Sequence, residues 1–255
     1  MYFGFGYPRI LATDLGRDEE WVFLQHDHEH MLGITQTSVQ LWSNGLHKLK
    51  LSCVARSDEN VEQEGRHVGA FWCSAKASIA VLTDKGFLHI YSIHVTKEPL
   101  LSGSTAARDL CKADVYLRHT TKLETTDVPL CITGDSKTLL LGCQDGSMVP
   151  CTWSGKLRPE VLRPVQEEDW GTGYGEMQPG ITSMQHCEKS RTIVLVLSDG
   201  SCALLSYPAG SGLSQVNEIE FSHWVCSPQM RATCARIGAS AQLIAVGTGL
   251  GHLAL

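Results

Sequence analysis

The chain has 255 residues, a formal net charge of −6, 43% hydrophobic residues and 19% charged residues. This acidic balance disfavours nucleic acid and anionic lipid as partners, because both call for a basic face. No apolar run approaches the roughly 18–20 residues that span a bilayer, and the opening MYFGFGYPRI lacks the basic leader and apolar core of a secretory signal. With 24 glycines, the composition is typical of a turn-rich, all-β, soluble protein.

Strands are predicted from the first residues onward. Residues 1–12 alternate aromatic residues with glycine before Pro8, which indicates an edge strand, since proline belongs at sheet edges and strand starts. Residues 21–25 and 31–35 are two further strands, joined around His26 to His30. The segment MLGITQTSVQLW at 31–42 predicts a hairpin with its turn at 36–38.

Four stronger copies of this hairpin follow along the chain. They are IAVLTDKGFLHIYSI at 79–93, LLLGCQDGSMVPCTW at 139–153, IVLVLSDGSCALLSY at 193–207 and LIAVGTGLGHLAL at 243–255. An Asp-Gly pair such as Asp145-Gly146 supplies the positive φ angles of a two-residue hairpin turn. A short strand and a turn precede each copy, at 71–73, 130–132, 181–184 and 234–236. Each unit therefore has three strands, and a fourth, outer strand is expected in the spacer.

The spacing of these units predicts the fold class. The turn glycines Gly86, Gly146, Gly200 and Gly251 lie 60, 54 and 51 residues apart, and Ser38 precedes the first by 48. Periods of roughly 40–50 residues with a hairpin in each unit are typical of β-propeller blades. We therefore expect residues 1–255 to form one all-β, WD-repeat-like propeller region with about five blades.

The spacers and the end of the chain refine this expectation. Residues 94–127 are expected to hold an outer strand and a surface loop, and residues 154–180 a flexible insertion with three prolines. The fifth hairpin ends at Leu255, with its second strand only begun. Since a seven-blade ring needs roughly 350 residues, an incomplete ring is expected, with an open sheet edge.

The ten cysteines do not predict a disulfide framework. They are scattered, without CxxC pairs, and Cys143, Cys151 and Cys202 fall inside predicted strands. A thiol in such a position behaves as a small buried hydrophobe. We therefore expect free thiols in a reducing, cytoplasmic setting.

The string HDHEH places His26, His28 and His30 at alternate positions. On one strand the three imidazoles would share a face and bind a metal, which would suit a propeller hydrolase. The alternative is a polar loop tip between two strands, and this interpretation is favoured. No metal or cofactor is therefore assigned.

No other residues predict a catalytic site. Asp84, Asp145 and Asp199 precede turn glycines, so turn chemistry explains them better than the paired carboxylates of a glycosidase do. The GTGYG at 171–175 lacks the flanking strand, helix and lysine of a phosphate loop. No serine lies in a nucleophile elbow and no cysteine has a local histidine partner. A non-catalytic binding protein is expected, although fold alone does not establish function.

Several blocks resemble the Ric-one family. The opening MYFGFGYP is similar to the start of its members, and Glu62-x-Glu64-Gly65, Ala70-x-Trp72-x-Ser74, residues 79–90, 139–157 and 243–251 continue the resemblance, in particular to plant-type members. Residues 94–127 and 154–180 match poorly.

The resemblance implies a particular function. The family is the large subunit of a Golgi guanine-nucleotide exchange complex that acts on Rab-six type GTPases in retrograde and intra-Golgi traffic. Its expected partners are a smaller arrestin-like exchange subunit and the Rab GTPase, and its expected location is cytoplasmic, peripheral on Golgi membranes. The alternative is a generic WD-repeat-like scaffold in another trafficking or regulatory complex. No exchange residue can be assigned to a position of this chain.

Overall fold

A computed structural model describes residues 19–44, 50–97, 111–163, 179–207, 213, 220–224, 231–238 and 244–254. The predicted strand at 1–12 and the GTGYG at 171–175 lie outside these residues, as do parts of both long spacers. Within the described part, no helix is long and apolar enough to cross a membrane.

The chain forms five antiparallel sheets, here named A to E in chain order. Sheet A contains β1 (Trp21–His26), β2 (His30–Thr35), β3 (Ser38–Ser43) and β4 (Lys50–Ala55). Sheet B contains β5 (His67–Cys73), β6 (Ser78–Thr83), β7 (Phe87–Lys97) and β8 (Cys111–Lys122). Sheet C contains β9 (Pro129–Gly134), β10 (Thr138–Cys143) and β11 (Met148–Thr152). Sheet D contains β12 (Ile181–Cys187), β13 (Thr192–Leu197), β14 (Cys202–Ser206) and β15 (Glu220–Trp224). Sheet E contains β16 (Ala232–Ile237), β17 (Ile244–Thr248) and β18 (Leu253–Ala254).

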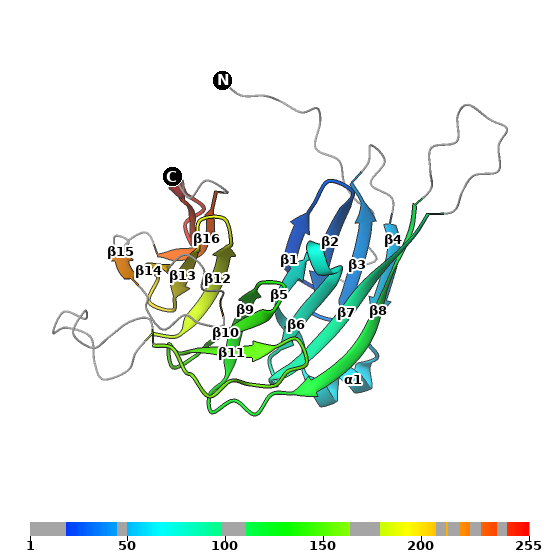
Figure 1. Ribbon diagram of the computed structural model, residues 1–255, viewed down its shortest axis with the longest axis horizontal. Coiled ribbons are helices and arrows are strands. Elements are labelled where there is room, and N and C mark those ends of the chain that lie inside the picture. Colours follow the sequence, from blue (N-terminus) through cyan, green and yellow to red (C-terminus); the bar gives the residue numbers. More distant parts are fainter. Residues whose placement is uncertain are drawn as a thin grey trace, which may run out of the picture.

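The five sheets follow one another in an arc, and the first strand of each sheet lies on the inside (Figure 1). Contacts join β1 to β5, β5 to β9, β9 to β12 and β12 to β16. Within each sheet the strands keep the order of the chain, so that every strand pairs with its neighbour in sequence. The prediction of an all-β protein is confirmed, and each of the five predicted hairpin ranges contains an antiparallel pair.

Apolar residues fill the space between each sheet and the next. Leu32 and Ile34 of sheet A pack with Trp72 and Val81 of sheet B. Similar clusters lie between sheets B and C, C and D, and D and E. The middle strands β6, β10 and β13 are buried along their whole length. Their continuous apolar sequence is therefore explained, because both of their faces are covered by a neighbouring sheet.

The hairpin turns differ from the predicted two-residue type. Gly146 has φ 78° and Gly200 has φ 85°, whereas Asp145 and Asp199 are not in the positive-φ region. The amide of Gly200 donates to Leu197 O at 2.9 Å, and that of Leu197 donates to Ser201 O at 2.9 Å. This pattern is a type I turn followed by a glycine bulge, a three-residue loop. The prediction was wrong because only one positive φ is required, and the aspartate instead accepts from the serine that follows the glycine.

A β-bulge at the same place in every inner strand gives the five sheets one register. It interrupts the pairing after Trp21, His67, Ile181 and Ala232, and next to Pro129 in sheet C. Counting from these residues defines equivalent positions in all sheets. The fourth residue after each of them is Gln25, Phe71, Thr133, Gln185 and Arg236.

Among the described residues, a fourth strand is present in sheets A, B and D, as predicted. In the spacer at 94–127, β8 pairs with β7 as an outer strand. In sheet C, the described residues that follow β11 form two isolated bridges, Met148 to Leu162 and Cys151 to Leu157. Free thiols are found at Cys53, Cys73, Cys131, Cys143, Cys151, Cys187, Cys202 and Cys234, and Cys143, Cys151 and Cys202 are buried as predicted.

Two short helices complete the described structure. The helix α1 (Asp58–Glu64) connects sheets A and B, and η1 (Ser74–Lys76) is a 3-10 turn between β5 and β6. The Ser57 hydroxyl caps α1 by accepting from the amide of Asn60 at 3.3 Å. Gly65 ends the helix with φ 88°, a conformation that glycine adopts without strain. Sequence analysis did not predict α1.

Candidate functional site

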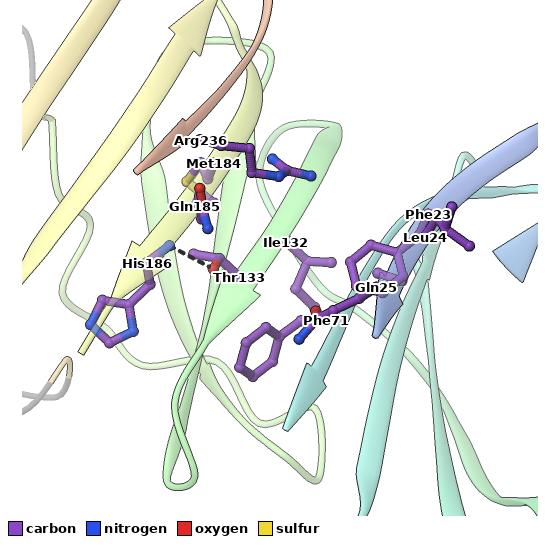
Figure 2. Close-up of a pocket in the computed structure, with 11 residues that line it drawn as sticks. Phe23, Leu24, Gln25, Phe71, Ile132, Thr133, Met184, Gln185, His186 and Arg236 are labelled. Atoms are coloured by element: carbon purple, nitrogen blue, oxygen red, sulfur yellow. Dashed lines mark hydrogen bonds between the residues drawn. The ribbon is translucent and has the colours of Figure 1, made fainter. Parts of the chain in front are cut away.

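The inner strands of all five sheets line one pocket with a volume of about 260 Å³. Its lining includes Gln25, Phe71, Thr133, Gln185 and Arg236, hereafter the pocket ring. These are the equivalent positions that the shared bulge defines, so the pocket results directly from the common register. Figure 2 shows Arg236 and Gln185 on one side, Phe23 and Leu24 on the other, and Ile132 between them.

Polar groups of the ring also tie neighbouring inner strands together. Gln185 Oε1 accepts from the amide of Ile237 at 2.8 Å, which joins β12 to β16. The amide of His186 donates to Thr133 Oγ1 at 3.2 Å, which joins β12 to β9 (Figure 2). Arg236 is exposed, and its guanidinium carries the one formal charge among the described lining residues.

His186 is held in one neutral form beside this pocket. Its Nδ1 lies 3.0 Å from Gly134 O, which can only accept, so Nδ1 carries the proton. Nε2 then accepts from the Tyr207 hydroxyl at 2.6 Å. Burial lowers the pKa of His186, although the hydrogen bond to Gly134 opposes this effect. Burial also raises the pKa of Tyr207 to about 12, so the phenol stays protonated and donates.

The pocket is therefore suited to binding. Apolar side chains and a few convergent polar groups are the usual lining of recognition sites. Amide side chains with one arginine offer hydrogen bonds to a polypeptide backbone or to a carboxylate. Since His186 is occupied by two partners, it is not placed as a general base toward the pocket.

A second group of polar side chains lies between sheets A and B, with the Glu64 side chain half-buried and the others buried. Arg56 Nη2 lies 2.9 Å from Glu64 Oε2, and His89 Nε2 lies 3.1 Å from the same oxygen. His67 contacts His89 edge to face, with ring centroids 5.8 Å apart, and its Nδ1 lies 2.9 Å from Thr35 O. Tyr91 lies beside His89 at 6.3 Å. These five residues, Arg56, Glu64, His67, His89 and Tyr91, are hereafter the buried polar cluster.

Both histidines of the buried polar cluster are neutral at physiological pH. Burial lowers the pKa of His67 to about 3, and the hydrogen bond to Thr35 does not offset this. Burial and then the positive charge of Arg56 lower the pKa of His89 to about 4. Arg56 also donates to Asn60 O at 2.8 Å and to Gly65 O, so it holds both ends of α1. The buried polar cluster therefore connects α1 to sheets A and B. The sequence did not predict this cluster, because its members are far apart in the chain and form no motif.

The residues singled out in the sequence lie elsewhere. His26 ends β1, His28 lies in the turn and His30 begins β2. Asp27 Oδ1 accepts from the amides of Glu29 and His30, which fixes this turn. His26 and His28 are exposed whereas His30 is buried, so the three imidazoles do not share one face. Among the described residues, no group of three potential ligands could hold a metal ion.

Asp145 and Asp199 each accept a hydrogen bond from the serine of their own turn, whereas Asp84 accepts one from the segment that precedes β5. Asp84 Oδ1 accepts from the amide of Arg66 at 2.9 Å, and Asp199 Oδ1 from that of Ser201 at 2.8 Å. Partial burial would raise the pKa of Asp145, but hydrogen bonds from Ser147 and the nearby Arg163 lower it on balance. A carboxylate that accepts such bonds in its ionised form is a structural group of the turn.

No protein-family model matches this sequence, and none of the curated proteins matches it.

Proposed function

We propose that the five sheets are blades of a WD-repeat-like β-propeller that acts as a protein-interaction platform. The observation that carries this proposal is the shared register, which places one residue from each inner strand around a single pocket. Repeats of this kind with consecutive strands, packed face to face, are the construction of propellers. The platform binds a polypeptide through the pocket ring, with Arg236 and the two glutamine amides as its polar contacts.

We further propose that the platform belongs to a subunit of a guanine-nucleotide exchange complex for a Golgi Rab GTPase. Support comes from the sequence blocks that resemble the Ric-one family, several of which lie in β6, β10, β11 and β17. An exchange factor needs no nucleophile or general base, because it lowers the affinity for nucleotide by differential binding. The partners are the smaller arrestin-like subunit and a Rab-six type GTPase, and the protein is cytoplasmic and peripheral on Golgi membranes.

The test has a binding arm and an activity arm. The 255-residue chain is immobilised, and binding of the purified arrestin-like subunit is measured for the wild type and for Arg236→Glu. Direct binding that Arg236→Glu weakens at least tenfold supports the platform. The matched control is Arg158→Glu, a charge reversal after β11 and outside the pocket. In the second arm, release of a labelled nucleotide from the Rab-six type GTPase is followed with the chain and the arrestin-like subunit together.

The outcomes distinguish the proposed interaction platform from the proposed exchange complex. Binding of the arrestin-like subunit with accelerated nucleotide release supports the exchange complex. Binding of neither the subunit nor the GTPase contradicts it. A different stable partner that depends on Arg236 would favour the generic WD-repeat-like scaffold.

A further inference from the structure

Two hydrogen-bond donors of the pocket lie together on one side of it. Gln185 Oε1 accepts from the amide of Ile237 at 2.8 Å, which fixes the orientation of the side-chain amide and leaves its Nε2 group as a donor. The same bond holds β12 beside β16 and so places Arg236, which precedes Ile237, close to Gln185. Arg236 Nη1 donates to Ala235 O at 3.1 Å, and a guanidinium has further N–H groups to offer. Figure 2 shows Arg236 and Gln185 on the same side of the pocket.

This donor side carries a positive charge that no other lining residue balances. Among the described lining residues, Arg236 is the one charged side chain and no carboxylate is present. A guanidinium beside an amide N–H group suits a carboxylate, because both groups donate to its oxygens and the bonds from the arginine are charge-assisted. Phosphate groups are usually bound by clusters of arginines, so a single guanidinium favours a singly charged anion. The donor side therefore selects a carboxylate.

A largely apolar surface faces the donor side across the pocket. Phe23 lies on the side away from Arg236, with Ile132 between them (Figure 2). Phe71 also lines the pocket, and it packs against Trp153 with ring centroids 6.0 Å apart. An apolar side chain that binds to this surface is removed from water, which favours binding. The pocket therefore combines a carboxylate site with an apolar site on its opposite side.

We propose that the pocket binds an acidic side chain of a polypeptide partner together with the apolar side chain of the next residue. In an extended segment, successive side chains point to opposite sides, so an acidic residue directed toward Arg236 places its neighbour toward Phe23 and Phe71. The volume of about 260 Å³ lies below the roughly 300–1,000 Å³ of pockets for drug-sized ligands, and it suits a pair of side chains. The carboxylate of a chain terminus is captured by backbone nests, whereas the donors here are side chains. This inference rests on the proposed interaction platform and names the chemistry that the platform recognises.

Selection from a peptide library tests the preference. Random short peptides are displayed with both ends joined to the display protein, so that no free terminus is present, and are selected on the immobilised 255-residue chain. The expected result is enrichment of aspartate or glutamate next to an aromatic or aliphatic residue. The tightest sequence is then synthesised with acetylated and amidated ends, and its affinity is measured by fluorescence anisotropy. Selection of no sequence, or of sequences without this pair, would overturn the proposal.

A double-mutant cycle assigns the acidic side chain to Arg236. Replacing the acidic residue of the peptide by its amide and replacing Arg236→Gln should each weaken binding about tenfold, and the two changes together should weaken it little more than either alone. Because Arg236 is exposed, thermal melting should show that the variant remains folded. The matched control is Arg118→Gln, at an exposed arginine of the outer strand β8, which should leave the affinity unchanged. Additive losses would place the carboxylate away from Arg236 and contradict the inference.

Failure of this inference is distinct from failure of the platform. If Arg236→Glu weakens binding of the arrestin-like subunit but the selected peptides lack the acidic and apolar pair, the platform stands and the proposed ligand chemistry is wrong. If neither the subunit nor any peptide binds, both proposals are wrong. A peptide that lacks the acidic residue but binds once its own C-terminus is free would assign the carboxylate to a chain end, which also overturns the inference.

Discussion

Gly142 and Gly247 occupy the same position in sheets C and E, but only Gly142 is pressed against a neighbouring sheet. A Cβ atom at Gly142 would lie 2.7 Å from Cys131 Sγ and 2.8 Å from Ile181 Cγ2. At Gly247 it would lie 2.7 Å from Cys234 Sγ, and its next neighbour would be 4.0 Å away. Cys131 is fixed by its bond to Ile181, whereas Cys234 is exposed and can change rotamer.

Alanine substitutions at Gly142 and Gly247 test this difference in packing. Gly142→Ala is expected to lower the free energy of unfolding by about 1–3 kcal/mol, as overpacking of a closed interface does. Gly247→Ala should change it by less than about 1 kcal/mol, because the Cys234 thiol can move away. Urea denaturation of both variants measures the difference. Equal losses would contradict the assignment of Gly142 alone to a closed interface.

The hydrogen bond between Tyr207 and His186 is predicted to contribute to stability. Tyr207→Phe leaves His186 Nε2 without its donor. Loss of one hydrogen bond from a half-buried group should cost about 1–2 kcal/mol of stability. Thermal melting measures this loss. Tyr116→Phe, at an exposed tyrosine of β8, is the control and should leave the stability unchanged, and equal losses in the two variants would contradict the prediction.

The buried polar cluster predicts a loss of stability in mild acid. The pKa values of His67 and His89 in the folded protein are about 3 and about 4, below the ordinary histidine value of 6.5. Between pH 6.5 and 5 the unfolded chain therefore binds protons that the folded chain does not. The free energy of unfolding should fall as pH decreases, approaching about 1.4 kcal/mol per pH unit for each histidine.

Two variants separate titration from packing in this cluster. His89→Gln removes one titrating group, so the slope of unfolding free energy against pH should decrease by up to about 1.4 kcal/mol per unit. Tyr91→Phe alters the same cluster, but the pKa of Tyr91 is raised to about 12 by burial, so it stays neutral across this range. That variant should shift the curve without changing its slope. An unchanged slope in His89→Gln would show that this histidine does not resist protonation.

The turn glycines differ in the space around them, and substitutions should reflect this. Gly86 has φ 72° and open space within 4 Å of the position that a Cβ would take, whereas a Cβ at Gly200 would lie 2.6 Å from Arg231 Cβ and 2.8 Å from its Cα. Gly86→Ala should cost about 1–2 kcal/mol for the left-handed conformation. Gly200→Ala should cost more, because a clash with Arg231 is added. Gly86→Asn should be milder than Gly86→Ala, since asparagine tolerates this conformation. Chemical denaturation ranks the three variants, and any other order would contradict the turn geometry.

The sequence pattern predicted the strands because apolar runs and turn glycines are local signals. It did not predict the turn type, since Asp145-Gly146 is compatible with both a two-residue and a three-residue loop until the hydrogen bonds are known. The helix α1 was missed although Ser57, Asp58 and Glu59 form a typical capped start and Gly65 a typical end. None of its seven residues is fully buried, so no apolar periodicity pointed to it.

The pocket ring and the buried polar cluster could not be predicted for a different reason. Gln25 and Arg236 are equivalent only because each inner strand has a bulge, and a bulge leaves no clear mark in a single sequence. The buried polar cluster joins Arg56 to His89 across two sheets, through contacts that depend on how the sheets pack. Such relationships are tertiary, and periodicity along the chain does not contain them.

The chain-order pairing within each sheet has a consequence for how the protein is made. Every sheet consists of one contiguous stretch, so each can pair its strands without waiting for distant parts of the chain. Contacts between close residues form with a small loss of loop entropy and favour fast folding. During synthesis, sheet A can form first and then serve as the surface on which sheet B condenses, and so on to sheet E. If the sheets fold one at a time, the newest sheet has one apolar packing face exposed to solvent until the next sheet forms and covers it.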